Sequence, residues 1–361
     1  MKKLVKYIIL FFNAIAIAAL LISYLTKWVS PVVSVFPSYL ALGFPVILII
    51  NILFILFWIF MARKVFLYST LAILLGWGIL NTYFGFIPEK DNINIPEKSL
   101  NIMSYNVRLF SIIPWFNSDP QLNEITSFVN DKNPDIISFQ EFSSEKKGDF
   151  SERKINQQLK KYKYHHIHYI DSKKRNYGLA LYSKHRIIGT GIIHFSNSLN
   201  GCIYADIKID TDTFRLYNIH LQSVRFDKKE HNFLENISET KDDQRIKGIK
   251  LVAERLQKAY IKRAQQAEEI KLHIQNSPFK VIVCGDFNAT PSSYAFNCLK
   301  RNFLDSFREA GKGIGATYEK GFPWLRIDYI LSDRYFYIQK HQTFSDFHSS
   351  DHFPIMATIK Y

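Results

Sequence analysis

The chain has 361 residues, with 46 Lys and Arg against 32 Asp and Glu and a formal charge of +14, and 47% of its residues are hydrophobic. This composition excludes a disordered chain and a fibrous repeat, and the length allows one large domain or two ordinary ones. Cys202, Cys284 and Cys298 are too few and too scattered for a disulfide framework or a thiolate zinc site.

The first quarter of the chain is almost free of charge, which excludes a wholly soluble protein. Long uncharged runs separate Lys6 from Lys27, Lys27 from Arg63, and Lys64 from Glu89. Each run is about as long as, or longer than, the roughly 20 residues that cross a bilayer as a helix. The membrane region is therefore expected to cover residues 1–87, with transmembrane helices near 7–25, 40–61 and 65–86.

Two other interpretations of these runs are weaker. Small residues over 14–18 would suit a cleaved signal peptide, but the apolar core of a signal peptide spans only about 7–15 residues. Buried helices of a soluble domain are the second alternative, yet such a domain rarely places three runs of this length in succession. An anchor explains all three runs together.

Basic residues predict the orientation of this membrane region, because Lys and Arg in short flanks stay on the cytoplasmic side. Three lysines precede the first run, Arg63 and Lys64 join the second and third, and the intervening loop holds only Lys27. The amino terminus is therefore expected in the cytoplasm, and the large domain after the third helix on the non-cytoplasmic face.

A polar, proline-flanked linker is expected over residues 88–98, followed by a soluble domain over 99–361. Helices are predicted over Leu122–Asp131, preceded by Ser118 and Asp119, and over Gln244–Gln275. The highly charged segment 224–248 is interpreted as a solvated loop. Short runs rich in β-branched and aromatic residues predict the strands Leu100–Tyr105, Asp135–Phe139, Tyr177–Tyr182, Ala205–Ile209, Thr213–Ile219, Lys280–Val283, Ile327–Leu331 and Ile355–Ile359.

Alternating strands and helices without a repeat period predict a layered α/β domain. Polar residues able to carry chemistry lie at or next to the strand ends, namely Asn106, Glu141, His220, Asp286, Asn288, Asp328, Asp351 and His352. A single polar residue in such a place usually forms a turn or a cap. A whole set of them at strand ends indicates a functional site. Carboxylate and amide oxygens suit a hard cation such as Mg²⁺ or Mn²⁺, whereas zinc would require more His or Cys.

These positions lie within a series of ordered motifs that resembles the endonuclease/exonuclease/phosphatase superfamily, and the similarity covers residues 99–361. The superfamily includes deoxyribonuclease I-like nucleases, exonuclease III-like repair enzymes, neutral sphingomyelinases and inositol polyphosphate 5-phosphatases. The resemblance implies a four-layer α/β sandwich with two packed sheets at its centre. The motifs are Ser104-Tyr105-Asn106-Val107, Phe139-Gln140-Glu141, Tyr177-Gly178-Leu179-Ala180-Leu181-Tyr182-Ser183, Asn218-Ile219-His220-Leu221, Gly285-Asp286-Phe287-Asn288, Arg326-Ile327-Asp328-Tyr329-Ile330 and Ser350-Asp351-His352-Phe353-Pro354.

The resemblance implies a divalent metal, Mg²⁺ or Mn²⁺, with Glu141 as its principal ligand. Asn106 and Asp351 would help to hold the metal or the substrate phosphate. Whether one or two metals bind is left open by the sequence.

The resemblance also implies roles for the remaining residues. Asp286 and Asn288 would orient the attacking water and the transition state. His352, paired with Asp328, would act as a general base or stabilise the phosphate, and His220 would donate a hydrogen bond or proton to the phosphate or leaving oxygen. Exonuclease III-like repair enzymes tend to use a Tyr-based arrangement in the motif that contains His220, so a role in abasic-site repair is disfavoured.

Three further stretches carry weaker signals. Arg175 and Asn176 are candidates to contact a substrate phosphate, although their basic surroundings also suit a solvated loop. The histidines of 165–168 alternate in a predicted strand and are interpreted as structural or surface residues. The aromatic stretch 322–324 is expected in the core, with lipid or substrate contact as the alternative.

The combined prediction is a membrane-anchored, metal-dependent phosphoesterase that hydrolyses phosphodiester or phosphomonoester bonds. A lipid headgroup is a candidate substrate because the active site would lie beside a bilayer. Nucleic acid is the alternative, since basic residues neutralise phosphates without regard to sequence, which would make the protein an extracytoplasmic nuclease. A catalytically silent membrane scaffold is the third hypothesis.

Overall fold

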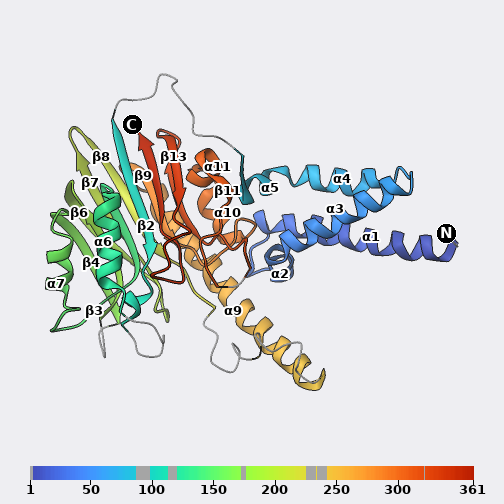
Figure 1. Ribbon diagram of the computed structural model, residues 1–361, viewed down its shortest axis with the longest axis horizontal. Coiled ribbons are helices and arrows are strands. Elements are labelled where there is room, and N and C mark those ends of the chain that lie inside the picture. The colour runs from blue at the N-terminus through green and yellow to red at the C-terminus, as the bar shows by residue number, and fades with distance from the viewer. Residues whose placement is uncertain are drawn as a thin grey trace. The chain divides into compact units, whose positions relative to one another are not determined.

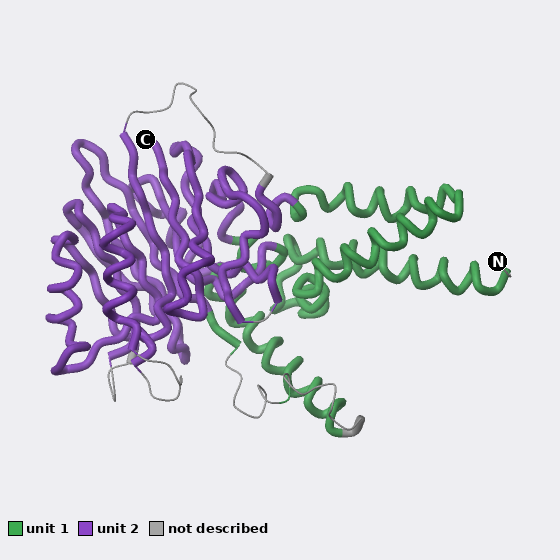
Figure 2. Tube along the Cα trace, viewed as in Figure 1, with its two compact units in different colours: residues 1–80, 222–267, 292–298 green, residues 81–221, 268–291, 299–361 purple. Residues whose placement is uncertain are grey.

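The computed structural model describes residues 3–86, 98–112, 120–171, 176–224, 233, 242–320 and 322–361. Contacts divide the chain into two compact units (Figure 2). Unit 1 comprises residues 1–80, 222–267 and 292–298, and unit 2 comprises residues 81–221, 268–291 and 299–361. Except for Lys98, the predicted linker 88–98 lies outside the described residues, as do Ser118 and Asp119.

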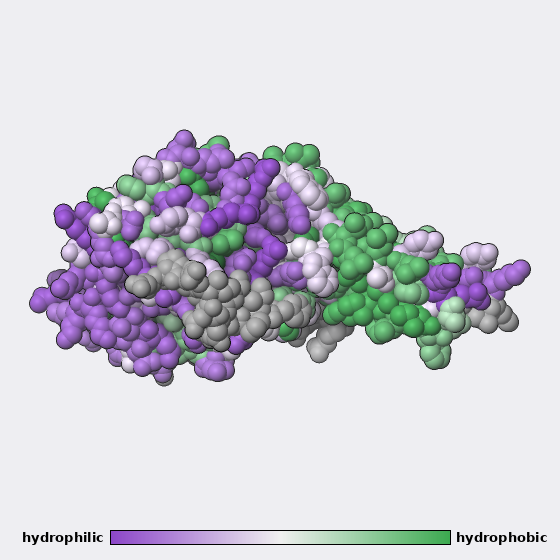
Figure 3. Space-filling model, turned by 90° about the horizontal axis from the view of Figure 1, so that it is seen from above, coloured by the Kyte–Doolittle hydropathy of each residue, from purple (hydrophilic) through white to green (hydrophobic). Residues whose placement is uncertain are grey.

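Unit 1 contains the apolar helices, and the face of them seen in Figure 3 is hydrophobic over a broad band, with hydrophilic residues gathered at one end. Helix α1 (Lys3–Tyr24) continues into the short 3₁₀ helix η1 (Leu25–Lys27), and this stretch is long and apolar enough to cross a membrane. Among the described residues it is the one continuous helix that meets this criterion; two bent helix pairs raise the number of candidate spans to as many as three.

Both remaining predicted spans are bent in the structure. Helices α2 (Phe36–Leu42) and α3 (Phe44–Phe60) meet at 71° around Gly43, where Pro45 cannot continue the preceding helix. Helices α4 (Phe66–Leu75) and α5 (Trp77–Tyr83) meet at 70°. They join at Gly76, where any Cβ atom would overlap the Tyr24 ring.

The predicted third span, 65–86, extends too far at its carboxyl end. Residues Phe84–Phe86 form strand β1, which pairs antiparallel with β11 (Lys312–Ile314) in unit 2. A short apolar run does not distinguish the end of a helix from a strand. The hydrophobicity of these residues therefore could not show where the helix ends and the strand begins.

Buried polar side chains connect the apolar helices of unit 1. Asn13 on α1 donates to Ser69 Oγ on α4 at 2.8 Å and accepts from the Trp58 indole of α3 at 2.9 Å. Asn51 on α3 donates to the Ala16 carbonyl of α1 at 3.0 Å. Interhelical hydrogen bonds of this kind stabilise helix pairs in an apolar environment. The network therefore joins α1, α3 and α4 into one bundle.

Unit 2 contains two mixed six-stranded sheets (Figure 1). The first sheet has the order β13-β14-β2-β3-β5-β4, and the second has the order β10-β12-β9-β8-β7-β6. Their strands are β2 (Ser99–Asn106), β3 (Ile136–Ser144), β4 (Tyr164–Asp171), β5 (Asn176–Ser183), β6 (Arg186–His194), β7 (Gly201–Ile209), β8 (Asp212–His220), β9 (Lys280–Asp286), β10 (Phe303–Asp305), β12 (Asp328–Asp333), β13 (Tyr337–Thr343) and β14 (Ile355–Lys360). All of the predicted strands are present.

Helices lie outside the two sheets, which confirms the predicted layered α/β fold. One core fills the space between the sheets, and a second lies between the first sheet and helices α6 (Leu122–Lys132) and α7 (Glu152–Gln158). The end of α9 (Asp242–Gln275) lies on the second sheet, where His273 hydrogen-bonds Tyr217 of β8 at 2.9 Å. The shorter helices are η2 (Arg108–Ser111), α10 (Tyr294–Lys300) and α11 (Ser306–Ala310).

The long helix α9 corrects one prediction. Its first turns occupy 242–248, the end of the segment that was interpreted as a loop, and most of the rest of that segment lies outside the described residues. Charged residues on one face are compatible with an amphipathic helix, so charge alone did not define a loop.

Two buried amides connect the sheets below the strand ends. Gln140 of β3 donates to Asn218 Oδ1 of β8 at 2.8 Å, and Asn218 donates to the Phe139 and Ala180 carbonyls at 2.8 and 3.0 Å. Because buried polar groups without partners are costly, these bonds fix the relative position of β3 and β8.

A buried ion pair explains the arginine of the Arg326-Ile327-Asp328 motif. Arg326 donates to both carboxylate oxygens of Asp305 at 3.0 and 2.7 Å, and its guanidinium lies over the Phe307 and Tyr329 rings. Burial alone would raise the pKa of Asp305, but Arg326 holds it below its ordinary value. Arg326 therefore stabilises the fold beside the site.

Replacing Asp305 by Asn should lower the free energy of unfolding by about 3–5 kcal/mol, because it leaves the Arg326 charge buried without its carboxylate. Since the pKa of Asp305 is lowered by folding, the ion pair contributes stability at neutral pH and loses it as the pH falls below the ordinary carboxylate range. Denaturant unfolding checks both effects. Asp131→Asn on the exposed ion pair with Lys132 is the control, with an expected cost under about 1 kcal/mol.

Candidate active site

Two pairs of parallel strands bring the predicted site residues to one end of unit 2. Strands β2 and β3 pair in parallel in the first sheet, with Asn106 opposite Gln140, and Glu141 comes next on β3. Strands β8 and β9 pair in parallel in the second sheet, with His220 opposite Asp286. Since the carboxyl ends of parallel neighbours meet at one edge, four strands present their last polar residues together.

The backbone is unusual at three of these positions. Glu141 lies in a β-bulge between Phe139 and Phe142 with φ of 50°, and Asn288 has φ of 49°. Gly285 has φ of 142°, and a Cβ there would overlap the Ile219 carbonyl of the neighbouring strand. Left-handed backbone at non-glycine residues is uncommon and gathers at functional sites, where the surrounding fold compensates its cost.

The Asp286 carboxylate is held by three hydrogen bonds. Its Oδ1 accepts from the Asn288 backbone N–H at 2.7 Å, and its Oδ2 accepts from the side-chain amides of Asn288 and Asn106, each at 3.0 Å. Burial raises the pKa of Asp286 to about 7, an effect that His352 partly offsets. Asp286 therefore holds its proton much more readily than an exposed carboxyl group.

His220 lies between two acidic residues. Its Nε2 is 3.5 Å from Asp286 Oδ2 and 3.8 Å from Glu141 Oε1, and its Nδ1 is 3.5 Å from the Tyr177 hydroxyl. One imidazole nitrogen therefore faces both carboxylates, which places Glu141 and Asp286 in the same pocket.

Asp351 reaches the site from the loop before β14. Ser350 donates to the Asn106 carbonyl at 2.8 Å, which attaches this loop to the end of β2. Arg108 Nε lies 3.3 Å from Asp351 Oδ2. The pKa of Glu141 is raised by burial and by the negative charge of Asp351, so these two carboxylates also interact.

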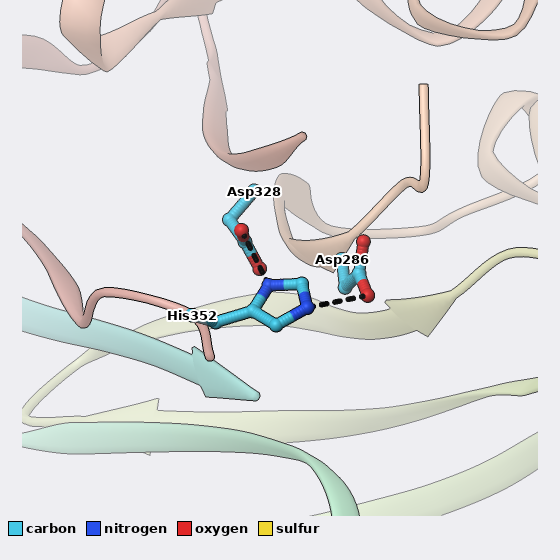
Figure 4. Close-up of side chains that lie close together, drawn as sticks. All are labelled: Asp286, Asp328 and His352. Atoms are coloured by element: carbon cyan, nitrogen blue, oxygen red, sulfur yellow. Dashed lines mark hydrogen bonds and ion pairs between the residues drawn. The ribbon is translucent and has the colours of Figure 1, made fainter. Parts of the chain in front are cut away.

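His352 and Asp328 form the closest charged contact of the site (Figure 4). Nδ1 of His352 is 2.9 Å from Asp328 Oδ2, and its Nε2 is 3.8 Å from Asp286 Oδ2. Burial would lower the pKa of His352, but Asp328 and Asp286 raise it to about 10. The imidazole is therefore a cation at neutral pH.

Two groups of residues offer metal ligands. Asp286, Asp328 and His352 present ligand atoms within 4.8 Å of one another, but a protonated imidazole already offsets one of the two carboxylate charges and has no lone pair for a metal. Glu141 and Asp351 are carboxylates with side chains 26% and 16% exposed, and the negative charge of Asp351 raises the pKa of Glu141. The second pair, with the Asn106 amide, fits a hard divalent cation better.

The remaining predicted site residues are Arg175 and Asn176. Arg175 lies outside the described residues. Asn176, at the start of β5, donates to Ser144 Oγ at 3.1 Å. The histidines of 165–168 belong to β4, at the far edge of the first sheet. Phe322 and Trp324 stack with ring centroids 5.0 Å apart, and Phe322 is exposed, contrary to the core position expected for this stretch.

Sequence reasoning missed two residues that contact the cluster. Arg108 follows the first motif closely, and its distance from Asn106 along the chain could have indicated it. Tyr318 lies with its ring centroid 5.0 Å from that of His352 and pairs with it in a β-bridge. No sequence signal marks Tyr318, because its position depends on a long-range backbone contact.

Comparison with known proteins agrees with this geometry. A sequence model described as the endonuclease/exonuclease/phosphatase family matches residues 103–352, and one described as a domain of unknown function matches residues 6–83. A search of curated proteins gave no significant match.

Solved structures of similar fold cover nearly three quarters of the chain. An endonuclease/exonuclease/phosphatase family protein from Bacteroides thetaiotaomicron is 16% identical, with a TM-score of 0.53, 73% of this chain covered and 95% of that one. Humanized TDP2 from D. rerio is 15% identical, with a TM-score of 0.51 and coverages of 73% and 99%. A mannosyl-6-phosphatase from B. thetaiotaomicron is 17% identical, with a TM-score of 0.50 and coverages of 73% and 100%. At these identities the likeness concerns the fold alone.

Proposed function

The chain belongs to the endonuclease/exonuclease/phosphatase family, and on this premise we propose that it is a divalent-metal-dependent phosphoesterase anchored in a membrane. The observation that carries the proposal is the meeting of Glu141, Asp286, Asp351 and two histidines at one end of both sheets. Family members hydrolyse phosphate esters, and the residues needed for that chemistry are all present in this chain.

Glu141 and Asp351, with Asn106, would hold the cation, which is Mg²⁺ or Mn²⁺ in this proposal because all the donors are oxygen atoms. When bound, such a cation neutralises charge that builds on the phosphoryl oxygens. Arg108, beside Asp351, keeps that carboxylate oriented toward the pocket.

The remaining roles in the reaction are assigned to three side chains. Asp286, fixed by the amides of Asn106 and Asn288, orients the attacking water and accepts its proton. The His352 cation, held by Asp328, stabilises the negative phosphate. The sequence leaves open whether His352 is a general base or a phosphate stabiliser, and its positive charge favours the phosphate stabiliser. His220 donates to the phosphate or the leaving oxygen.

The anchor in this proposal is the bundle of unit 1, with α1 and the two bent pairs as three crossings. Two observations support it: the Asn13 network that joins α1, α3 and α4, and the broad hydrophobic band on the face of these helices seen in Figure 3. Lys3, Lys6, Arg63 and Lys64 lie at the amino end of α1 and between α3 and α4, so we propose a cytoplasmic amino terminus and a non-cytoplasmic catalytic domain over residues 99–361.

The substrate proposed first is a phospholipid or sphingolipid headgroup, because the anchor would keep the active site beside lipid. The net charge of +14 also suits nucleic acid, and one structural neighbour, TDP2 from D. rerio, was solved with a single-strand DNA product. A nuclease is therefore the second candidate.

Turnover by the purified full chain tests the proposal. Bis-p-nitrophenyl phosphate should be hydrolysed with Mg²⁺ or Mn²⁺, lose activity with a chelator and recover when the metal returns. Sphingomyelin, phosphatidylinositol phosphates and single-strand DNA, compared at equal concentration, then separate lipid hydrolase from nuclease. Absence of turnover with every divalent metal and every substrate would support the silent scaffold.

A further inference from the structure

The part of α9 that belongs to unit 1, residues 242–267, has a continuous apolar stripe. Ile246, Ile249, Ala253, Leu256 and Tyr260 recur at intervals of three and four residues, which places them on one face of the helix. The phosphoesterase mechanism uses none of these residues, so the stripe needs another explanation.

The second half of the stripe is covered by the apolar helix bundle. The Tyr39 hydroxyl of α2 donates to the Ala253 carbonyl at 2.8 Å, and the Tyr39 and Tyr260 rings meet edge to face with centroids 5.8 Å apart. Helix α2 lies in the connection between α1 and α3. In the proposed topology this connection is on the non-cytoplasmic side. The middle of α9 therefore lies where that loop meets the bilayer surface.

Among the residues that the structure describes, the bundle does not cover the first half of the stripe. Ile246 is 68% exposed and Ile249 is 51% exposed, although they continue the face that packs on α2. Lys247 lies on the opposite side of these turns, Lys250 lies at the edge of the stripe one turn after Ile246, and both are exposed. Figure 2 shows this end of α9 extending clear of the other helices of unit 1.

Other exposed apolar residues lie next to α2. In the loop before it, Trp28 is 70% and Val33 83% exposed, and Phe36 in its first turn is 58% exposed. An amphipathic helix with lysines on its polar face and a neighbouring exposed Trp has the composition of segments that lie in a bilayer interface.

We propose that the first turns of α9 lie on an anionic lipid surface, with Ile246 and Ile249 inserted among the acyl chains and Lys247 and Lys250 contacting anionic headgroups. The inference rests on the proposed anchoring and deepens it, since it gives the catalytic domain its own lipid contact. The occupant is lipid because the covered half of the same stripe contacts the apolar bundle and the exposed half is flanked by positive charge.

Depth-dependent fluorescence quenching in vesicles tests this contact. The full chain carries Cys298→Ser, and the fully buried Cys202 and Cys284 stay unlabelled. An environment-sensitive probe is attached through Ile246→Cys, and the protein is reconstituted with brominated lipids in phosphatidylcholine alone or with phosphatidylglycerol. About twofold or greater quenching is expected with phosphatidylglycerol and much less without it, since the apolar face reaches about 5–10 Å into the lipid.

Matched variants separate the possible outcomes. A probe at Lys247→Cys, on the polar face, should be quenched much less, and Lys247→Gln with Lys250→Gln should reduce quenching at Ile246→Cys to the level in neutral vesicles. A probe at Leu53→Cys, 58% exposed on α3, should be quenched in both lipids.

Each contrary result has a distinct meaning. Quenching at Leu53→Cys without quenching at Ile246→Cys overturns this inference and leaves the anchor standing. No quenching at Leu53→Cys overturns the anchor and the inference together. If the unlabelled Ile246→Cys protein forms a disulfide between two copies under air oxidation, and the labelled protein is not quenched, a second chain covers the stripe and the inference is overturned.

Discussion

Replacing Glu141 by Gln is expected to reduce phosphodiester turnover by about 10³-fold or more, because removal of the main carboxylate ligand forfeits several kcal/mol of transition-state stabilisation. The substitution keeps the shape of the side chain and removes only its charge. Since Glu141 occupies a left-handed position in a bulge, its backbone should be retained, and the fold should be as stable as before or slightly more stable.

Binding of Mn²⁺, followed by electron paramagnetic resonance, provides the second measurement. Glu141→Gln should weaken Mn²⁺ binding at least about tenfold, whereas Asp131→Asn on the exposed face of α6 should change neither binding nor turnover. If Glu141→Gln binds Mn²⁺ as tightly as the unaltered chain, the cation is not held by Glu141, and the proposed site is wrong.

The strands that the sequence predicts and those that it misses differ in a single physical respect. The strands predicted from apolar runs all lie inside their sheets, between two neighbours. The strands missed in the two large sheets, β6, β10 and β13, are edges, and the fourth edge strand, β4, was indicated only by its alternating histidines. An interior strand has a neighbour on both edges and most of its residues are buried, so its apolar residues form a recognisable run. An edge strand such as β6, where exposed and half-buried residues alternate, contains polar residues and glycines that weaken the signal.

The same reasoning explains how much of the site was predictable. Asn106, His220 and Asp286 each end an interior strand, and Glu141 lies in a bulge of one, so a local motif sufficed to find them. Tyr318 belongs to an irregular segment that reaches His352 through a β-bridge, and nothing in its neighbours along the chain specifies that contact. The bends near Gly43 and Gly76 were missed for another reason. Hydropathy predicts which residues lie in lipid, but it does not predict where a helix changes direction.

The His352–Asp328 pair leads to the second large effect. His352→Gln is expected to reduce kcat by about 10²–10³-fold, because it removes a cation that stabilises the phosphate. Asp328→Asn should produce a similar loss, since the imidazole then lacks the carboxylate that holds its proton and its orientation. Because both changes act on one function, the double variant should be within about threefold of either single variant.

Metal affinity distinguishes this pair from the Glu141 side of the pocket. In our assignment, His352→Gln and Asp328→Asn leave Mn²⁺ binding within about threefold of the unaltered chain, because neither residue is a ligand. If the cluster of Asp286, Asp328 and His352 held the cation instead, the same variants would abolish binding and Glu141→Gln would not. The charge of His352 makes the first result the expected one, since a cation placed between two carboxylates repels a second cation.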